Sequence, residues 1–331
     1  MSGLRVPVVE VRLDRRSWRD HLAGLTAAGL RDDPPWIPPV WFYDRYGSEL
    51  FERITRLAEY YPTRCERSIL AAHAGRIAEV TGAETLVELG SGTSEKTTLL
   101  LDALAERGTL RQVVPFDVSE EVLRAAADEL AARYPDALVH AVAGDYHEHL
   151  DRLPATGSCL LAFLGSTIGN LTPTERSGFL DAVTGVLGHE DWFLLGTDLV
   201  KDPERLVAAY DDPGGVTAEF NLNALRVLQR ELGADLEPAD WQHRAVYDES
   251  EERIEMHLVA TGATHIRIGH LGVDRTLRAG AWIRTEISTK FRTDALHAEL
   301  EAAGLGVVGS WTDEAGDFLL TLAQPRGTSA S

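Results

Sequence analysis

The sequence predicts an α/β protein: a doubly wound parallel β-sheet with helices on both faces and an inserted α+β part. Short, almost wholly apolar runs alternate with helical patterns between residues 85 and 196, which is the pattern of a parallel sheet covered on both faces. The first run leads into a glycine turn, Gly90-Ser91-Gly92, and then a helical pattern, as in the opening unit of such a sheet. After Asp198 the rhythm changes to helices followed by runs that indicate antiparallel strands.

The elements before the sheet are expected to be one strand and three helices. Residues 8–13 alternate in polarity and predict a strand, and helical spacing predicts helices over 16–30, 47–57 and 63–80. The segment DDPPWIPPVWFYD connects the first two helices. It cannot form a regular helix, because each proline fixes φ, removes a backbone donor and restricts the residue before it.

The remaining elements are predicted in the same way, from runs of apolar residues for strands and from helical spacing for helices. The strands of the sheet are expected at 85–89, 112–116, 138–142, 159–164 and 191–196. The helices between them are expected from about Thr93, over 120–133 with Ser119 as the N-cap, and over 173–187. The later elements are expected as helices over 203–210, 218–232 and 293–303, and strands over 242–247, 253–260, 265–268, 280–291, 307–311 and 318–322.

The change of rhythm after Asp198 also predicts the domain organisation. We expect a core made of residues 63–199 and 290–325, interrupted by an insertion of residues 200–289. Residues 1–62 are expected to fold beside this insertion, and residues 326–331 to form a disordered tail.

Composition and charge exclude several kinds of partner. The 331 residues include 32 basic and 52 acidic side chains, and the net charge of −20 argues against nucleic acid or an anionic membrane as the main partner. Two cysteines predict neither a disulfide framework nor a metal site. No apolar run reaches the roughly 20 residues needed to span a bilayer. The N-terminus has no apolar signal core, so we expect a cytoplasmic protein, and we expect a monomer.

The glycine turn favours S-adenosylmethionine over a dinucleotide. A dinucleotide turn needs a third glycine three residues after Gly92, where this chain has Glu95. A carboxylate there would repel a pyrophosphate at the helix N-terminus. S-adenosylmethionine carries a sulfonium cation and no phosphate, so the acidic Glu88 on the strand suits it better. The alternative is a glycine turn that only packs the helix against the strand.

Further candidates follow the ends of the expected strands. Asp117 ends the second strand, where an acid commonly binds ribose hydroxyls; the alternative is an acid that complements the next helix dipole. Asp145 and Tyr146 follow the third strand and would reach the adenine, unless they form a solvated loop. Lys96 faces the same edge if the helix starts near Thr93, and is otherwise a surface lysine. Asn170 follows the fourth strand, and its alternative is a turn residue beside Gly169.

Two polar groups and a set of aromatic residues complete the candidates. Glu286 and Ser288 lie two residues apart in WIRTEIST and therefore share one strand face, where they would grip a small polar group. An exposed strand face is the alternative. Tyr43 and Tyr60 precede the core among other aromatic residues; they either pack or place a hydroxyl in a pocket.

With these residues assembled, the chain closely resembles the histidine-specific N-α-methyltransferases of ergothioneine biosynthesis. The resemblance runs from about Tyr43 to Leu322. It rests on these segments, in this order: YDRYGSELFERIT, EYYPTR, LVELGSGTSEKT, the strand-ending Asp117, GDY, FLGSTIGNL, LLGTDLVKD, AAYDD, AEFN and WIRTEISTKF. It implies a class I methyltransferase (Rossmann-like) core, and a substrate-binding domain formed by the N-terminal segment and the insertion, which closes over the amino acid.

The resemblance also implies a role for each matching residue. Those that would line the S-adenosylmethionine site are Gly90, Lys96, Asp117, Asp145 and Tyr146. Asn170 and Tyr210 would hold the α-carboxylate and amine end of L-histidine. The imidazole would be held by Tyr60, Glu286 and Ser288, and Met256 would border the ring. Tyr43 and Gly165 would border the amine, with Tyr43 or a bound water relaying its proton; Tyr43 and Asn170 are therefore the expected catalytic residues.

The implied activity is trimethylation of the α-amine of L-histidine to hercynine, the first step of ergothioneine biosynthesis. Two alternatives stay open. One is an enzyme of this fold that methylates another aromatic amino acid, although an indole or phenol has no second basic nitrogen to satisfy Glu286 and Ser288. The other is a non-catalytic module that binds S-adenosylmethionine. The residues whose presence argues against it are Tyr43, Asn170, Tyr210 and Glu286.

Overall fold

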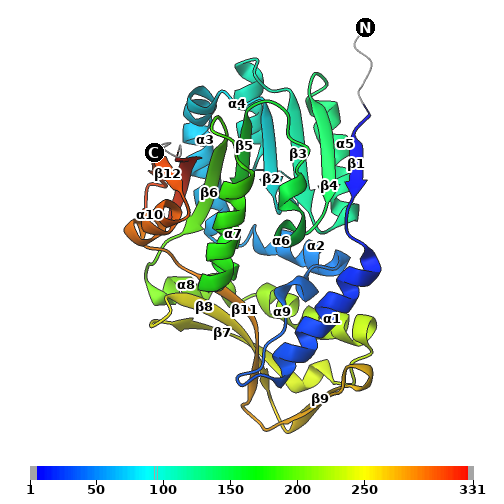
Figure 1. Cartoon of the computed structure of the whole chain (residues 1–331). Helices are drawn as coiled ribbons and strands as arrows, with labels where there is room; N and C mark the ends of the chain where they lie inside the picture. The colour runs from blue at the N-terminus through cyan, green and yellow to red at the C-terminus, as the bar shows by residue number, and fades with distance from the viewer. Residues whose placement is uncertain (1–5, 93, 95, 327–331) are drawn as a thin grey trace. The chain divides into compact units, whose positions relative to one another are not determined.

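The computed structural model describes residues 6–92, 94 and 96–326, and these form two compact units (Figure 1). Unit 1 contains the described residues of Met1–Asp14, Arg64–Leu199 and Phe291–Ser331, and unit 2 contains Arg15–Thr63 and Val200–Lys290. Within the described residues, no helix combines the length and the apolar character needed to cross a membrane.

Unit 1 is built on an eight-stranded sheet. Its order is β1 (Val8–Val11), β4 (Leu138–Ala143), β3 (Gln112–Asp117), β2 (Thr85–Leu89), β5 (Cys159–Phe163), β6 (Trp192–Asp198), β13 (Phe318–Pro325) and β12 (Leu305–Thr312). The strands from β1 to β6 pair in parallel, and β13 is antiparallel to both of its neighbours. The chain order reverses direction between β2 and β5, and ligands of doubly wound sheets bind at the carboxyl ends of strands beside such a switch.

Helices cover both faces of this sheet, as the nearly continuous apolar strands require (Figure 1). In β2, Leu86 belongs to one core cluster, and its neighbours Val87 and Leu89 belong to the other. The first cluster includes side chains of α3 (Pro62–Thr81), α4 (Thr98–Glu106) and α5 (Glu120–Arg133). The second includes side chains of α7 (Pro173–Val186) and α10 (Thr293–Ala302).

The N-terminal strand lies elsewhere than expected. We expected all of residues 1–62 to fold beside the insertion, but β1 pairs with β4 and extends the sheet of unit 1. The alternation in residues 8–13 predicts a strand without naming its partner, so sequence could not place it. Across the new edge, the Glu10 carboxylate accepts from Arg12 and lies 3.1 Å from Nε2 of His140 on β4.

Unit 2 is α+β. Its helices are α1 (Arg15–Arg31), α2 (Arg45–Ile54), α8 (Pro203–Tyr210) and α9 (Val216–Leu232). A three-stranded antiparallel sheet has the order β11 (Trp282–Thr289), β8 (Arg253–Ala260) and β7 (Trp241–Asp248). A second, two-stranded sheet pairs β9 (Thr264–Ile268) with β10 (Val273–Leu277), a strand that the sequence did not predict. The predicted fold class, a doubly wound Rossmann-like core with an α+β insertion, is confirmed.

A β-bulge interrupts the alternation of β11. Arg284 lies opposite His257 and Glu286 opposite Met256, so Thr285 is the extra residue. Ser288 lies opposite Ile254, which keeps Glu286 and Ser288 on one face of the sheet, as the alternation predicts.

Two details at the helix starts differ from expectation. Helix α4 begins at Thr98, so Lys96 precedes it; Thr93 and Glu95 lie outside the described residues. Ser119 is the N-cap of α5, but its side chain makes no capping hydrogen bond. Instead, the Asp117 carboxylate accepts from the Ser119 N–H at 2.9 Å.

The close packing of α2 predicts opposite effects for two glycine substitutions. A Cβ at Gly47 in α2 would lie 1.6 Å from the backbone oxygen of Phe42, whereas a Cβ at Gly24 in α1 would have no heavy atom of the described residues within 4 Å. We expect Gly47→Ala to lower the free energy of unfolding by about 3 kcal/mol or more, because backbone must move. The control Gly24→Ala should raise it by about 0.5–1 kcal/mol. Urea unfolding followed by circular dichroism measures both, and equal effects would contradict this packing.

Candidate active site

The turn between β2 and α4 is fixed by the neighbouring strand. The N–H groups of Gly90 and Ser91 donate to the backbone oxygen of Phe116 on β3 at 2.8 and 3.1 Å. Gly90 has a φ of +66°, a left-handed conformation that glycine adopts without strain. Among the described residues, no heavy atom lies within 4 Å of a Cβ built at Gly90 or Gly92. The described part of the turn therefore leaves its backbone accessible, so that a ligand can approach closely.

Asp117 ties the end of β3 to this turn. Its Oδ2 accepts from the Gly92 N–H and its Oδ1 from the Ser119 N–H, both at 2.9 Å. Burial raises the pKa of Asp117, and the backbone N–H groups act in the opposite direction. The carboxylate is thereby held at the carboxyl ends of β2 and β3, where the sequence predicts a ribose.

Glu88 is a buried acid on the same edge. Its side chain is 4% exposed, and within the described part of the chain its Oε2 has no hydrogen-bond partner. Burial raises the pKa of Glu88 to about 7, while the hydroxyls of Thr97 and Ser94 and the charge of Lys96 oppose the rise. An acceptor left buried in this way suits a ligand that brings N–H donors or a positive charge. This feature fits S-adenosylmethionine and would not suit a pyrophosphate.

Glu66 on α3 was missed by the sequence analysis. It is fully buried, and its Oε2 accepts from the ammonium of Lys96 while its Oε1 accepts from the Gly165 N–H at 2.7 Å. Gly196 on β6 leaves room for it, since a Cβ there would lie 2.1 Å from Oε1. In the sequence, Glu66 could have been noticed because it lies three residues before Ile69 and so on the apolar face of the predicted helix. Glu66 links two predicted site residues that follow different strands.

The ends of β4 and β5 carry the remaining candidates of unit 1. Asp145, the second residue after β4, is buried, and Tyr146 opens the short helix α6 (Tyr146–His149). The Tyr146 ring packs edge-on against Phe163 with 5.5 Å between ring centroids, and burial raises its pKa, so the hydroxyl stays protonated. After β5, Asn170 ends the 3₁₀ turn Thr167–Asn170 and is half-buried.

The structure thus brings the predicted residues of unit 1 to one edge of the sheet. They follow the carboxyl ends of four adjacent parallel strands, β4, β3, β2 and β5. These residues are Gly90, Lys96, Asp117, Asp145, Tyr146, Gly165 and Asn170.

In unit 2, Tyr210 and Ser288 meet directly. Tyr210 ends α8, and its hydroxyl lies 2.8 Å from Oγ of Ser288 on β11. The ammonium of Lys290 donates to both oxygens, at 3.0 Å to Tyr210 and 2.8 Å to Ser288. Lys290 is 2% exposed and was not among the predicted residues. We call these three residues the hydroxyl–ammonium trio.

Glu286 and Met256 lie beside the trio. They are opposite each other in the register of β11 and β8, on the face that also carries Ser288. Met256 is buried, and Glu286 is half-buried. Burial raises the pKa of Glu286 to about 7, and the charge of Lys290 opposes this rise.

Aromatic contacts connect Tyr43 and Tyr60 to Tyr210. The rings of Tyr60 and Tyr210 pack edge-on at 6.1 Å between centroids. Phe51 packs against Tyr60 at 6.3 Å and against Tyr43 at 5.8 Å in the same geometry. Tyr43 is 37% exposed, so its ring packs while solvent reaches part of it. The packing alternative is therefore confirmed for these rings, and whether a hydroxyl also serves a ligand stays a prediction.

A buried network supports both the bulge and Tyr210. The Asn221 amide donates to Nδ1 of His243 at 2.8 Å, and Nε2 of His243 lies 2.8 Å from the backbone oxygen of Tyr210. The bulged Thr285 donates to the side-chain oxygen of Asn221 at 2.7 Å. Burial lowers the pKa of His243, and these partners assign the proton of a neutral ring to Nε2.

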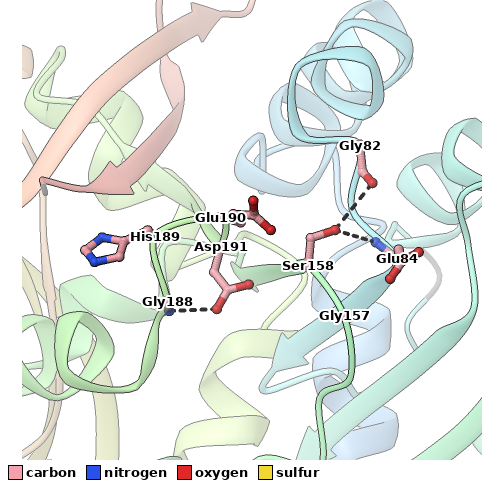
Figure 2. Close-up of a pocket in the computed structure, with 8 residues that line it drawn as sticks. All are labelled: Gly82, Glu84, Gly157, Ser158, Gly188, His189, Glu190 and Asp191. Carbon is pink, nitrogen blue, oxygen red and sulfur yellow. Dashed lines mark hydrogen bonds between the residues drawn. The ribbon is translucent and has the colours of Figure 1, made fainter.

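A hollow at the opposite end of the sheet carries none of the predicted residues (Figure 2). Its residues precede β2, β5 and β6, so it lies at the amino ends of the strands. Asp191, which lines it, accepts from the N–H groups of Cys159 and Gly188, both at 2.7 Å. Figure 2 shows the Gly188 bond together with the contacts of Ser158. The hydrogen bonds of Asp191 and Ser158 therefore connect the loops that precede the strands.

Comparison with known proteins supplies relatives over most of the chain. The model of a family described as histidine-specific, S-adenosylmethionine-dependent methyltransferases matches residues 22–325. A histidine N-alpha-methyltransferase of Mycobacterium tuberculosis is 55% identical over 89% of this chain and 92% of its own. One from Mycolicibacterium smegmatis is 52% identical over 92% and 94%. Ergothioneine biosynthesis protein 1 of Neurospora crassa is 35% identical over 85% of this chain and 32% of its own length.

The raised pKa of Glu88 predicts a pH-dependent stability that its amide variant lacks. The folded protein keeps this proton up to about pH 7, whereas the unfolded chain loses it near 4.5. Stability should therefore fall as the pH rises from about 5 to 8, because the folded state binds more protons there. Relative to Glu88→Gln, the wild type should lose on the order of 3 kcal/mol across this window.

Urea unfolding of both proteins at pH 5 and pH 8 measures this loss. Other titrating groups are common to both proteins and cancel in the difference. A difference in unfolding free energy that is the same at both pH values would contradict the raised pKa.

Proposed function

Since this chain belongs to the family of histidine-specific, S-adenosylmethionine-dependent methyltransferases, we propose that it methylates the α-amine of L-histidine three times, giving hercynine, in the first step of ergothioneine biosynthesis. The family match and the two relatives above 50% identity support this activity. The observation that carries the substrate is the shared face of Glu286 and Ser288 beside Tyr210. An acceptor and a hydroxyl placed together suit a ring with two nitrogens.

The donor is assigned to the edge residues of unit 1. S-adenosylmethionine supplies a methyl group activated by its sulfonium. Gly90 leaves room for the ligand beside the turn, and Glu88 offers a buried acceptor for its positive charge or its N–H groups. Asp117, which two backbone N–H groups already fix, is assigned to the ribose hydroxyls, and Asp145 and Tyr146 are assigned to the adenine. Lys96, held by Glu66, completes this set.

The substrate residues are assigned by their chemistry. In unit 2, Glu286 accepts from one ring N–H, Ser288 faces the other nitrogen, and Tyr60 and Met256 border the ring. Tyr210 is assigned to the carboxylate and amine end of the amino acid. In unit 1, Asn170 is assigned to that same end, and Gly165 borders the amine.

Positioning and proton removal are the help that these residues give. Each transfer forms one N–C bond, breaks one S–C bond and releases S-adenosylhomocysteine, and the nitrogen must lose one proton before each attack. The α-amine is mostly protonated at neutral pH, so this proton must pass to an acceptor before each attack. Tyr43, packed yet partly exposed, is assigned to relay that proton to solvent, and Asn170 to orient the lone pair.

One assay separates the proposed function from its alternatives. Purified protein is incubated with isotope-labelled S-adenosylmethionine and each of the amino acids in turn, and products are fragmented in a mass spectrometer. We expect label in mono-, di- and trimethylhistidine in that order, always on the α-nitrogen. Methyl groups on the imidazole would contradict the assigned pose. Preference for tryptophan or another aromatic amino acid, or donor binding without transfer, would favour the alternatives.

Glu286 is expected to set substrate identity. A site that pairs with a substrate N–H rejects analogues that lack it, because its own buried group is then left unpaired, and such discrimination reaches on the order of 10⁴-fold. We expect Glu286→Ala to lose most turnover of histidine while its discrimination against tryptophan falls. The ratio of kcat/KM for histidine to that for tryptophan measures this change.

The matched control for Glu286 is Glu255→Gln. Glu255 lies opposite Ile287 in the same sheet, so its side chain is on the other face, where it pairs with His257 and Arg253. We expect this variant to keep the wild-type ratio. An unchanged ratio in an active Glu286→Ala protein would mean that Glu286 does not read the imidazole.

A further inference from the structure

Asn221 ends the segment AEFN, which helps to carry the family resemblance, and the proposed chemistry gives it no role. We propose that Asn221 is a positioning residue for recognition of the amino-acid substrate. Through Thr285 it holds the bulge that places Glu286. Through His243 it holds the backbone at Tyr210. The inference rests on the proposed function and deepens it, since it names the buried group on which the geometry of the substrate residues depends.

The bulge in β11 decides on which face of the sheet Glu286 lies. If the strand continued from Arg284 without the extra residue, Glu286 would lie opposite Glu255. Its carboxylate would then be on the other face of the sheet, beside a second carboxylate, which is an unfavourable pair. The place of Glu286 therefore depends on what keeps Thr285 in the bulge.

The side chain of Thr285 is held between a helix and a strand. Asn221 on α9 is fully buried, and its Oδ1 accepts from the Thr285 hydroxyl at 2.7 Å. The same hydroxyl lies 3.0 Å from the backbone oxygen of Met256 on β8, which is opposite Glu286 at the bulge. The extra residue is thus fixed from two sides.

The partners of Asn221 also fix the direction of its amide. The backbone oxygen of His257, 3.1 Å away, only accepts, so the amide nitrogen must be on that side. The same nitrogen donates to Nδ1 of His243 at 2.8 Å, and Nε2 of His243 donates to the backbone oxygen of Tyr210 at 2.8 Å. A second ring proton, on Nδ1, would face the amide N–H and break this link.

A buried amide contributes more to direction than to stability. Its hydrogen bonds replace bonds that the unfolded chain makes to water, so their net contribution to stability is small. An apolar side chain of similar volume would fill the same space on α9 without that exchange. The amide of Asn221 instead joins α9 to β7, β8 and β11 through donors and acceptors of fixed direction. This points to a role in orienting the residues that those strands carry.

Two substitutions separate direction from packing. Asn221→Leu keeps the volume and removes every hydrogen bond of the amide. Asn221→Asp keeps an acceptor for Thr285 but has no N–H group. It can join Nδ1 of His243 only when one more proton is bound, on the new carboxylate or on the ring. The measured quantity is the ratio of kcat/KM for histidine to that for tryptophan, taken relative to wild type at the same pH.

The matched control is Asn223→Leu. Asn223 is a buried asparagine of the same helix, but its amide donates to Oδ1 of Asp44 at 2.8 Å and to the backbone oxygen of Phe42 at 3.4 Å. These partners flank Tyr43, which is assigned to the amine end that both amino acids share. The control should therefore lose stability and keep the ratio. Melting temperature and calorimetric binding of S-adenosylhomocysteine report whether each variant is folded.

We expect Asn221→Leu to lower the histidine-to-tryptophan ratio at least about tenfold, because Glu286 is no longer held on its face. In Asn221→Asp the ratio should approach the wild-type value at low pH, where the extra proton restores the link to His243, and fall as the pH rises. Nitrogen-15 NMR of the imidazole follows that proton.

The other groups that act on the His243 ring are the same in all variants. The Asp211 carboxylate lies 3.8 Å from Nε2, and the charges of Asp212 and His257 also act on the ring. An unchanged ratio in folded, active Asn221→Leu would overturn the proposal. So would a ratio in Asn221→Asp that falls equally at every pH while the NMR signals show the proton being lost.

Thr285→Val decides the outcome if neither variant at Asn221 folds. It removes only the hydroxyl that the bulge offers to the amide. The same fall in the ratio supports the proposal, and an unchanged ratio overturns it. Wild-type protein that methylates no histidine at all would instead refute the proposed function, so the two failures are distinguishable.

Discussion

The backbone oxygen of Phe116 at the end of β3 holds the glycine turn. The edge of the sheet where S-adenosylmethionine is predicted to bind depends on that contact. Because Gly90 and Ser91 donate to this one oxygen, the turn is folded against the neighbouring strand rather than left as a loose loop. The next residue along β3, Asp117, contacts the segments that follow both neighbouring strands. Its side chain accepts from the N–H of Gly92 after β2, and its backbone oxygen accepts from the N–H of Gly144 after β4 at 2.9 Å. Three parallel strands are thus joined beyond the end of their own ladder, which gives a ligand a rigid backbone surface.

In unit 2, buried polar side chains between an antiparallel sheet and its helices must find hydrogen-bond partners within the protein. The Thr285 hydroxyl at the bulge is buried, and it donates to the side-chain oxygen of Asn221. The Asn221 amide donates to Nδ1 of His243, and Nε2 of His243 donates to the backbone oxygen of Tyr210. Buried networks of this kind favour one geometry when every member is satisfied. The network therefore orients Tyr210 and the strand carrying Glu286 together.

Much of the fold was predictable because most elements carry their own period. The strands 85–89 and 253–260 and the helices 120–133 and 203–210 match the structure residue for residue. The partner of β1, the strand β10 and the bulge were not predictable, since alternation defines a face and not a neighbour. For the candidate site, the sequence could identify the residues at the ends of the strands, and the roles of these residues stay predictions. Glu66 and Lys290 were missed because a charged residue in the sequence does not show which partner it meets once the chain is folded.

The ends of the long insertion meet inside unit 1. Leu199 and Phe291 form a backbone bridge, and the Phe291 N–H donates to the backbone oxygen of Asp198 at 2.8 Å. Residues 200–290 are therefore an insertion whose two ends are joined by backbone contacts next to the sheet of unit 1. A segment attached in this way can be lengthened, shortened or replaced during evolution without shifting the register of the strands on either side. Descendants of one ancestral core can in this way acquire different insertions while the parallel sheet of unit 1 is inherited unchanged.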